Sequence, residues 1–117
     1  MIGPAASEHQ EQTALMGLLR YRMRREIVCF SIPNGGLRNP RVQQQLIDSG
    51  LLPGAPDLYF AREEGRSLFM EMKTKKGVLS DVQQGVKFKL EALGHDWVLA
   101  RSVDEAMEHL SQRGLLR

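Results

Sequence analysis

The sequence predicts an α/β fold in which a mixed β-sheet is flanked by helices on both sides. The chain has 117 residues, and one domain usually takes about 100 to 200, so we expect a single domain spanning residues 1–117, with residues 1–6 as a flexible start. Helical and strand patterns follow one another in the order α-β-α-β-β-α-β-α. Two neighbouring strand patterns joined by a short polar turn predict an antiparallel hairpin. Helices that bracket such a run of strands are typical of an α/β sandwich.

The first helix is predicted over residues 8–25, which contain no proline and one glycine. At about 100° per residue, Leu15 and Leu19 form its apolar stripe, and Gln12 and Glu8 continue that stripe with polar side chains. A polar continuation of a buried stripe needs an explanation. Four arginines crowd the last turn, where positive charge favours the helix dipole. We interpret them as a solvated helix end: Arg20, Arg22, Arg24 and Arg25.

The remaining elements follow from proline, glycine and capping residues. Asn39 before Pro40 starts a short helix. Ser80 with Gln83, and Ser102 with Glu105, form capping boxes that start two later helices. The predicted elements are a strand at 26–32, a short helix at 40–49, hairpin strands at 57–61 and 67–73, a helix at 80–93, a strand at 97–101 and a helix at 102–112.

Composition and charge exclude several classes of protein. Hydrophobic residues make up 42% and charged residues 26% of the chain, which is ordinary for a globular domain and argues against disorder. No apolar stretch approaches the ~20 residues of a membrane span, and the start lacks a signal pattern, so we expect a cytoplasmic protein. A single cysteine, Cys29, excludes an internal disulfide. The 16 Lys and Arg residues against 14 Asp and Glu permit a nucleic-acid partner without requiring one. The histidines are scattered, and we expect them on the solvated surface: His9, His95 and His109.

Three charged residues lie where a globular domain favours apolar side chains. Asp57 opens a predicted strand after Pro56, and Glu71 and Lys73 lie in the next strand. Side chains of a strand alternate between faces, so Glu71 and Lys73 share one face. Asp57 lies opposite Glu71 on that face if the hairpin loop has an odd number of residues, with Gly65 in its left-handed position, or if the hairpin contains a bulge between the two acids. A two-residue turn would put the acids on opposite faces.

Two acids beside a lysine indicate a particular chemistry. Adjacent carboxylates repel, and a divalent cation that prefers oxygen ligands, Mg²⁺ or Mn²⁺, relieves that repulsion. The lysine can orient or deprotonate a water, or stabilise the charge that builds on a phosphate. This combination indicates hydrolysis of a phosphodiester. The competing interpretation is a surface salt bridge on an edge hairpin.

The spacing of these residues resembles a known signature. Pro56-Asp57, followed 14 residues later by Glu71-Met72-Lys73, resembles the motif of the PD-(D/E)XK nuclease superfamily, and the predicted element order resembles its core. Over about residues 7–106 the motifs together resemble the VRR-Nuc domain, the virus-type replication-repair nuclease. These motifs are Ser7-Glu8 with Gln12, Asn34-Gly35-Gly36 with Arg38, Gly54-Ala55-Pro56-Asp57-Leu58, Glu71-Met72-Lys73, and Gly77 with Ser80 and Gln83.

The resemblance implies a role for each residue of the central motif. Asp57 and Glu71 would be metal ligands, with the backbone carbonyl of Met72 as a third ligand. Lys73 would be the catalytic lysine. The implied cofactor is Mg²⁺ or Mn²⁺, without an organic cofactor.

The resemblance also assigns residues on two helices. The acid of the family's first helix maps to Glu8, which explains the polar end of the apolar stripe, and Glu11 is the reserve candidate. Gln83 matches a glutamine placed beside the lysine. Since Gln83 also belongs to a capping box with Ser80, the two roles would compete for one side chain, and helical spacing directs it towards the site.

Six further residues are candidates for contact with DNA. Backbone amides and a guanidinium of a glycine-containing loop could hold a phosphate, although the glycines could also simply turn the chain. Two lysines continue past the strand that carries Lys73. The candidates are Asn34, Gly35, Gly36, Arg38, Lys75 and Lys76.

The sequence thus predicts a metal-dependent DNA endonuclease. The resemblance implies a homodimer that acts on branched DNA such as four-way (Holliday) junctions. Two symmetric cuts need two sites, which fits a two-fold dimer formed through the short helix at 41–49 or through the last helix. Two alternatives stay open: a nucleic-acid-binding module of the same fold without turnover, and a small interaction subunit whose mixed charge is a solvated surface.

Overall fold

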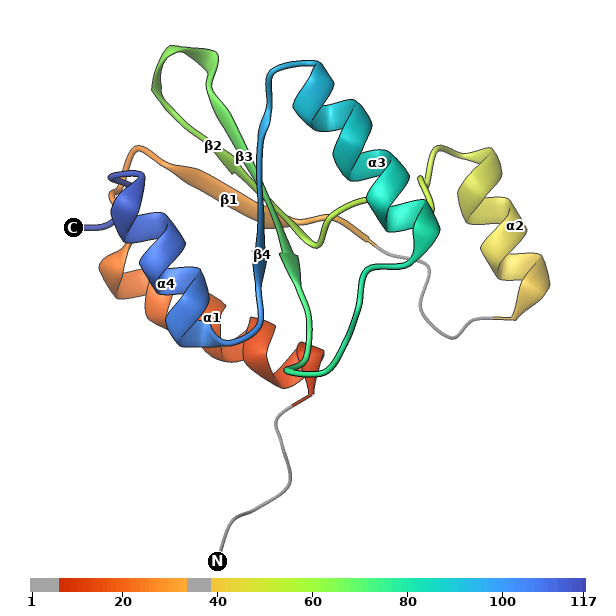
Figure 1. Cartoon of the computed structure of the whole chain (residues 1–117), viewed down its shortest axis with the longest axis horizontal. Coiled ribbons are helices and arrows are strands. Elements are labelled where there is room, and N and C mark those ends of the chain that lie inside the picture. Colours follow the sequence, from red (N-terminus) through yellow and green to blue (C-terminus); the bar gives the residue numbers. More distant parts are fainter. Residues whose placement is uncertain (1–6, 34–38) are drawn as a thin grey trace, which may run out of the picture.

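The computed structural model describes residues 7–33 and 39–117. Within them, helices and strands follow one another in the predicted order, and the mixed α/β fold is confirmed (Figure 1). None of the described helices is long and apolar enough to cross a membrane. The elements are α1 Glu8–Arg22, β1 Val28–Ser31, α2 Pro40–Asp48, β2 Leu58–Ala61, β3 Ser67–Met72, α3 Asp81–Ala92, β4 Asp96–Ala100 and α4 Val103–Gln112, with a 3₁₀ turn, η1, at Glu63–Gly65.

The strands form one mixed sheet in the order β1-β2-β3-β4. β1 pairs antiparallel with β2 and β2 antiparallel with β3, whereas β4 pairs parallel with β3. A parallel neighbour needs a long crossover connection, which α3 supplies. β3 therefore lies between an antiparallel and a parallel neighbour, and its C-terminal end carries Glu71 and Met72.

One face of the sheet holds the hydrophobic core. α1 and α4 pack against each other and cover this face (Figure 1). Leu15 and Leu19 of α1 are buried there, as the predicted apolar stripe requires. The strands contribute every second side chain to the same core: Leu58, Phe60, Leu68, Met70, Met72, Val98 and Ala100.

The opposite face is only partly covered. α3 packs on β4, with Lys87 Nζ 5.2 Å from the centre of the Trp97 ring. Towards β1 this face carries a row of rings, Phe30, Tyr59 and Phe69, with centroids 5.2 and 5.1 Å apart. Phe30 is 50% exposed. The expected helical cover on both faces therefore fails over β1, because α2 lies beside the sheet and buries none of its residues (Figure 1).

The β2–β3 connection is a three-residue loop. Arg62 N donates a hydrogen bond to Arg66 O at 2.8 Å, and Glu63–Gly65 lies between them. Gly65 adopts a φ of 70°, so the predicted odd loop with a left-handed Gly65 is confirmed. Glu64 is also left-handed, with a φ of 61°, which the sequence does not predict because non-glycine residues rarely adopt it.

α1 ends before the predicted position 25. Met23 leaves the helix with a ψ of 142° and forms an isolated bridge with Leu116 near the C-terminus. Arg24 forms ion pairs with Glu26 and Glu63. The interpretation of all four arginines as a solvated helix end is therefore wrong for Arg24, which joins the chain after α1 to the hairpin loop.

The two predicted capping boxes differ. Ser80 and Gln83 form both halves of theirs. Ser102 accepts a hydrogen bond from the Glu105 amide at 3.1 Å, but the Glu105 carboxylate accepts one from the Arg101 amide at 3.3 Å instead of returning to Ser102. The φ of Ser102 is −162°, against −68° at Ser80, which turns its own amide away from the helix start.

Candidate active site

A buried carboxylate at the end of β3 is the centre of the site. Glu71 is 2% exposed. Its neighbours Met70 and Met72 point into the core, so Glu71 faces the other side of the sheet. Its Oε2 is buried and has no hydrogen-bond partner among the described atoms. An unpaired buried carboxylate oxygen destabilises a fold. Such destabilising residues are often found at binding sites.

Asp57 meets Glu71 across the hairpin. Leu58 pairs with Met70, so the next residues in the same register are Asp57 and Glu71. Asp57 Oδ2 accepts a hydrogen bond from the Met72 amide at 2.7 Å, and the Asp57 carboxylate lies close enough to Glu71 to raise the pKa of Glu71. The structure therefore brings the two acids together on one face, as the odd hairpin loop requires.

The loop before β2 holds Asp57 against α3. Gly54 has a φ of 85°, and a Cβ there would lie 2.8 Å from Val82 Cγ1 and 2.9 Å from the Val82 carbonyl carbon and oxygen. Ala55 and Pro56, which follow, are buried. Only glycine allows both this φ and this close approach of the backbone, so Gly54 sets the distance between Asp57 and the start of α3.

The acid pair retains a proton at neutral pH. Burial first, and then the neighbouring Asp57 carboxylate with its negative charge, raise the pKa of Glu71 from 4.5 to about 9. The charge of Lys73 opposes this rise and that of Glu8 adds to it. Two carboxyl groups this close do not both ionise without a neutralising partner. The pair is thus an anion of single charge until a cation reaches it.

Gln83 links α3 to the buried carboxylate. Its Oε1 accepts a hydrogen bond from the Ser80 amide at 3.0 Å, and its Nε2 donates one to Glu71 Oε1 at 2.6 Å. The predicted competition between capping and the site is therefore wrong, because a primary amide has an acceptor end and a donor end. Of the two Glu71 oxygens, Oε2 is the one that remains for a ligand.

Lys73 lies just beyond the end of β3 and is half-buried. Its backbone amide donates to Ala100 O at 3.0 Å, which continues the pairing with β4. Its positive charge opposes the rise in the pKa of Glu71, so its ammonium group lies within electrostatic reach of the acids. A Cβ on Gly77 would lie 3.5 Å from Lys73 Cδ, so the turn after β3 folds back along the lysine side chain.

Arg101 is a positioning residue that the sequence does not reveal. Its Nη1 donates to the carbonyl oxygens of Thr74, Lys75 and Gly77 at 2.8, 3.3 and 2.5 Å. One guanidinium group therefore fixes the turn that follows Lys73. The local sequence pattern does not separate this arginine from a surface arginine, because its three acceptors lie on a distant segment of the chain.

Of the two acids at the start of α1, Glu8 is the one whose charge acts on Glu71. Its negative charge adds to the rise in the pKa of Glu71, although its side chain is exposed. Glu11 Oε2 instead accepts a hydrogen bond from the Val103 amide at 2.9 Å. Glu11 therefore caps α4, where the helix dipole favours a carboxylate.

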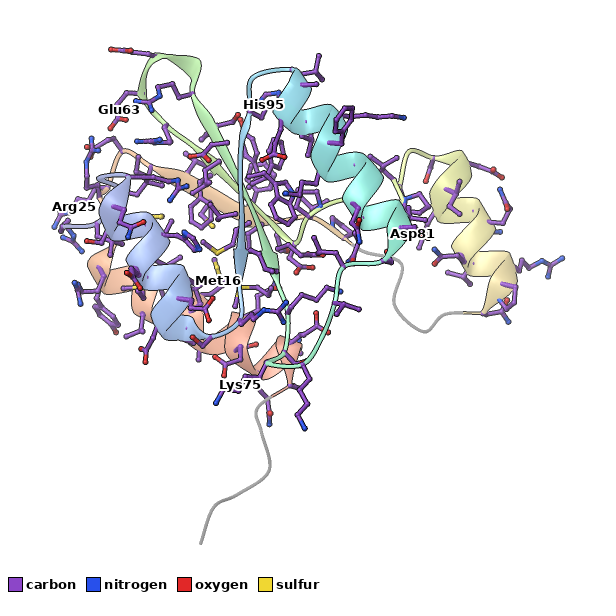
Figure 2. The ribbon with its side chains drawn as sticks, viewed as in Figure 1. Met16, Arg25, Glu63, Lys75, Asp81 and His95 are labelled. Carbon is purple, nitrogen blue, oxygen red and sulfur yellow. The ribbon has the colours of Figure 1, made fainter. Side chains whose placement is uncertain are left out.

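The candidates for DNA contact fall into two groups. Asn34, Gly35, Gly36 and Arg38 lie outside the described residues. Lys75 and Lys76 are exposed in the turn held by Arg101. Figure 2 shows Lys75 projecting at the end of the molecule where α1 begins.

The cysteine and two of the histidines lie elsewhere in the fold. Burial raises the pKa of the Cys29 thiol to about 12. His95 Nδ1 hydrogen-bonds with Ser67 Oγ, and His109 Nε2 with Leu99 O at 3.0 Å. Both histidines are half-buried, so their expected place on the solvated surface is wrong, because each is held by a partner on the sheet.

The donor set fits a cation that keeps several water ligands. Within residues 7–33 and 39–117, no three His, Cys, Asp or Glu side chains group closely enough to hold a metal by themselves. The oxygen donors that the structure brings together are the carboxylates of Asp57 and Glu71, and Glu71 Oε2 has no hydrogen-bond partner among the described atoms; the carbonyl of Met72 stays a predicted third ligand. Mg²⁺ and Mn²⁺ prefer oxygen ligands, and Mg²⁺ is often held by one or two carboxylates with water and substrate phosphates.

Comparison with known proteins bears on the fold. No protein-family model matches the sequence, and no curated protein matches it. A solved structure described as "VRR_NUC domain protein" superimposes on this chain with a TM-score of 0.72 and covers 93% of this chain and 88% of its own. The two sequences are 18% identical. The chain therefore has the fold of a VRR-Nuc domain, the fold that its sequence motifs imply.

Proposed function

We propose that the protein is a metal-dependent DNA endonuclease that hydrolyses phosphodiester bonds at the cluster of Asp57, Glu71 and Lys73. The observation that carries the proposal is the buried Glu71 carboxylate, which lies opposite Asp57 and whose Oε2 has no hydrogen-bond partner among the described atoms. The fold shared with a VRR_NUC domain protein supports the same activity.

Some residues of the cluster would hold the metal ion, and others fix the carboxylates that hold it. Asp57, Glu71 and the carbonyl of Met72 would hold Mg²⁺ or Mn²⁺, which when bound supplies a Lewis acid for water and phosphate. Gln83 fixes Glu71 through Oε1, and the Met72 amide fixes Asp57 through Oδ2. Held in this way, the two carboxylates need little reorganisation to receive the cation.

The charged residues around the acids act on substrate and water. The Lys73 ammonium orients the attacking water, or stabilises the negative charge that grows on the phosphate during attack. Glu8 accepts a hydrogen bond from water at the open side of the site. Contact with the DNA backbone falls to the proposed phosphate-binding residues: Asn34, Gly35, Gly36, Arg38, Lys75 and Lys76.

Cleavage of a labelled four-way junction in Mg²⁺ or Mn²⁺, against EDTA, tests the proposal. Asp57→Ala, Glu71→Ala and Lys73→Ala should each reduce the rate by about 10²-fold or more and leave the circular dichroism spectrum unchanged. Matched controls on exposed positions of the helices, Lys89→Ala and Glu108→Ala, should cleave as the wild type does.

Two outcomes would contradict this assignment. Cleavage at the wild-type rate by all three site variants would place the chemistry elsewhere. Wild-type protein that binds the junction but cleaves in neither metal would instead indicate the non-catalytic binding module.

We also propose a homodimer formed through α2. Ala106 and Leu110 of α4 are buried in the core, so this helix has fewer apolar side chains for a partner. α2 leaves Val42 and Ile47 43% and 36% exposed. A two-fold dimer would carry two sites for the two cuts of a four-way junction.

The sedimentation of a double variant tests the dimer. Val42→Glu combined with Ile47→Glu should sediment as a folded monomer and make single nicks in place of paired cuts. An unchanged dimer would place the interface on another surface, and a monomeric wild type would refute the dimer.

A further inference from the structure

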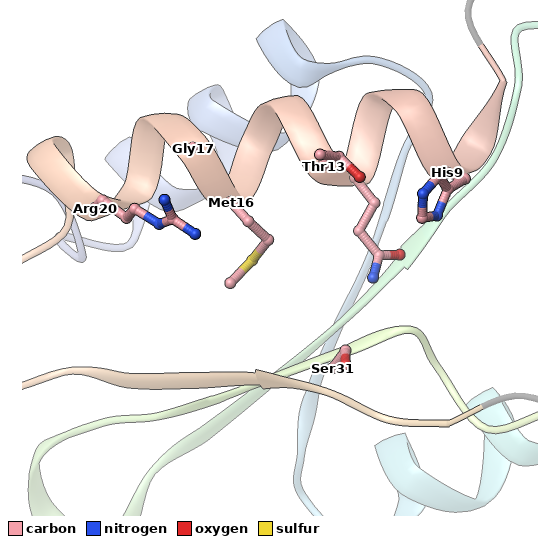
Figure 3. A pocket seen from close by; sticks show the side chains of 7 residues that line it. His9, Thr13, Met16, Gly17, Arg20 and Ser31 are labelled. Atoms are coloured by element: carbon pink, nitrogen blue, oxygen red, sulfur yellow. The ribbon is translucent and has the colours of Figure 1, made fainter.

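A groove runs between α1 and β1. Its volume is about 380 Å³, and its lining includes His9, Gln12, Met16, Gly17 and Arg20 from α1 and Ser31 from β1. Figure 3 shows the α1 side chains along one side of the helix, with Met16 directed towards β1 and Ser31 on the facing strand. The groove is thus walled by a helix and by the outermost strand of the sheet.

One end of the groove adjoins the proposed active site. His9 follows Glu8 at the start of α1, and Ile32, directly after β1, donates its amide proton to Asp57 O at 2.8 Å. Arg20 lies at the other end, about 16 Å along the helix axis at 1.5 Å per residue. A linear ligand that reaches the acid cluster can therefore continue along this groove.

Gly17 has no packing requirement for glycine. It lies in the middle of α1, where glycine is less stable than alanine, and its φ is not in the left-handed range. A Cβ at this position would meet no atom within 4 Å. The open space beside it belongs to the groove, and a bare helix backbone there lets a ligand approach closely.

Arg20 provides a positive charge that forms no ion pair with another described residue. It is exposed and takes part in none of the ion pairs among the described residues, whereas Arg24 pairs with Glu26 and Glu63. A guanidinium group that lines a groove is suited to a phosphate oxygen, which it binds through two parallel hydrogen bonds.

We propose that this groove binds one strand of the DNA substrate, with Gly17 admitting its sugar-phosphate backbone and Arg20 contacting one phosphate. At 3.4 Å per stacked nucleotide, about 16 Å corresponds to about five nucleotides between the end of the groove at His9 and that phosphate. The inference rests on the proposed function, because it takes the acid cluster as the place of cleavage.

Substitution of the glycine separates a binding role from a structural one. Gly17→Ala should raise the melting temperature by about 2–6 °C, because alanine favours the helix, and should weaken binding of a fluorescein-labelled four-way junction by about fivefold or more. Binding is measured by anisotropy with Ca²⁺ in place of Mg²⁺. Gly85→Ala is the matched control: this glycine of α3 also has no atom within 4 Å of a Cβ, so it should raise the melting temperature similarly and leave binding unchanged.

Substitution of the arginine tests the phosphate contact. We expect Arg20→Ala to reduce, by about 1, the slope of the logarithm of the association constant for the junction against the logarithm of the salt concentration. Arg20→Lys should retain the slope. Arg22→Ala removes the same charge from the same helix outside the groove lining and should leave the slope unchanged.

The outcomes distinguish this inference from the proposed function. Wild-type affinity in both Gly17→Ala and Arg20→Ala, together with metal-dependent cleavage by the wild type, would overturn the groove and leave the endonuclease in place. Loss of binding in both variants of a protein that cleaves in neither metal would support the groove and overturn the endonuclease. Absence of DNA binding by the wild type would overturn both.

Discussion

Glu71→Gln should stabilise the metal-free protein above about pH 5. Burial first, and then Asp57, raise the pKa of Glu71 to about 9 in the folded protein. The pKa of a glutamate in an unfolded chain is about 4.3. Between these values the folded state keeps a proton that the unfolded state has released. The free energy of unfolding therefore falls as pH rises, by about 1.4 kcal/mol per pH unit.

From pH 5 to pH 7 this loss amounts to about 2–3 kcal/mol. Glutamine has the shape of the protonated carboxyl group and no proton to release, so the variant should escape the loss. Urea unfolding in EDTA at pH 5, 6 and 7 measures the free energy for both proteins. Glu108→Gln, on an exposed position of α4, is the control.

Added metal should make the wild type more stable than Glu71→Gln. At pH 7, Mn²⁺ replaces the proton in the wild type and raises its free energy of unfolding according to concentration and affinity, while Glu71→Gln should gain little. Parallel dependence of the wild type and Glu71→Gln on pH would refute the reasoning, since it would mean that the carboxyl group does not hold its proton in the fold.

Three further predictions follow from single contacts. Gly54→Ala should destabilise the fold by about 2 kcal/mol or more and slow cleavage, because its Cβ would collide with the Val82 backbone; Gly50→Ala, also at a positive φ but with open space around it, should lose less stability and keep its cleavage rate. Arg101→Ala should speed amide exchange in the turn after β3 and leave β4 protected; unchanged exchange would show that the three carbonyl contacts do not hold the turn. Cys29 should resist a thiol reagent at pH 8 until urea unfolds the chain, because burial raises its pKa to about 12, and rapid reaction in the native state would contradict that burial.

The acid pair is the part of the site that the sequence predicts well. Alternation along a strand is a local rule, and one hairpin loop of odd length is enough to bring Asp57 opposite Glu71. Gly65 marks that loop in the sequence. The choice of Glu8 over Glu11 as the acid of the first helix rests on the family resemblance and stays a prediction.

Contacts between distant segments are the part that the sequence does not predict. Arg101 binds carbonyls of a turn that lies before α3 and β4 in the chain. Every residue has a backbone carbonyl, so the residue types of the turn do not indicate this contact. Gln83 carries two roles because Glu71 happens to lie at the free end of its amide. The position of α2 beside the sheet likewise depends on where the chain leaves β1, which helical periodicity does not report.

β3 pairs antiparallel with β2 and parallel with β4, and this determines the order in which the parts of the site form during folding. The β2–β3 hairpin closes a short loop and forms on the scale of microseconds, whereas the β3–β4 pair must wait for the crossover through α3. Gln83 and the Ala100 carbonyl arrive only with that crossover. A growing chain therefore aligns its two carboxylates early and buries them last, so the final step of folding requires the pair to take up a proton or a cation. The end of the sheet that carries the acids is therefore expected to be the first part of the fold to open.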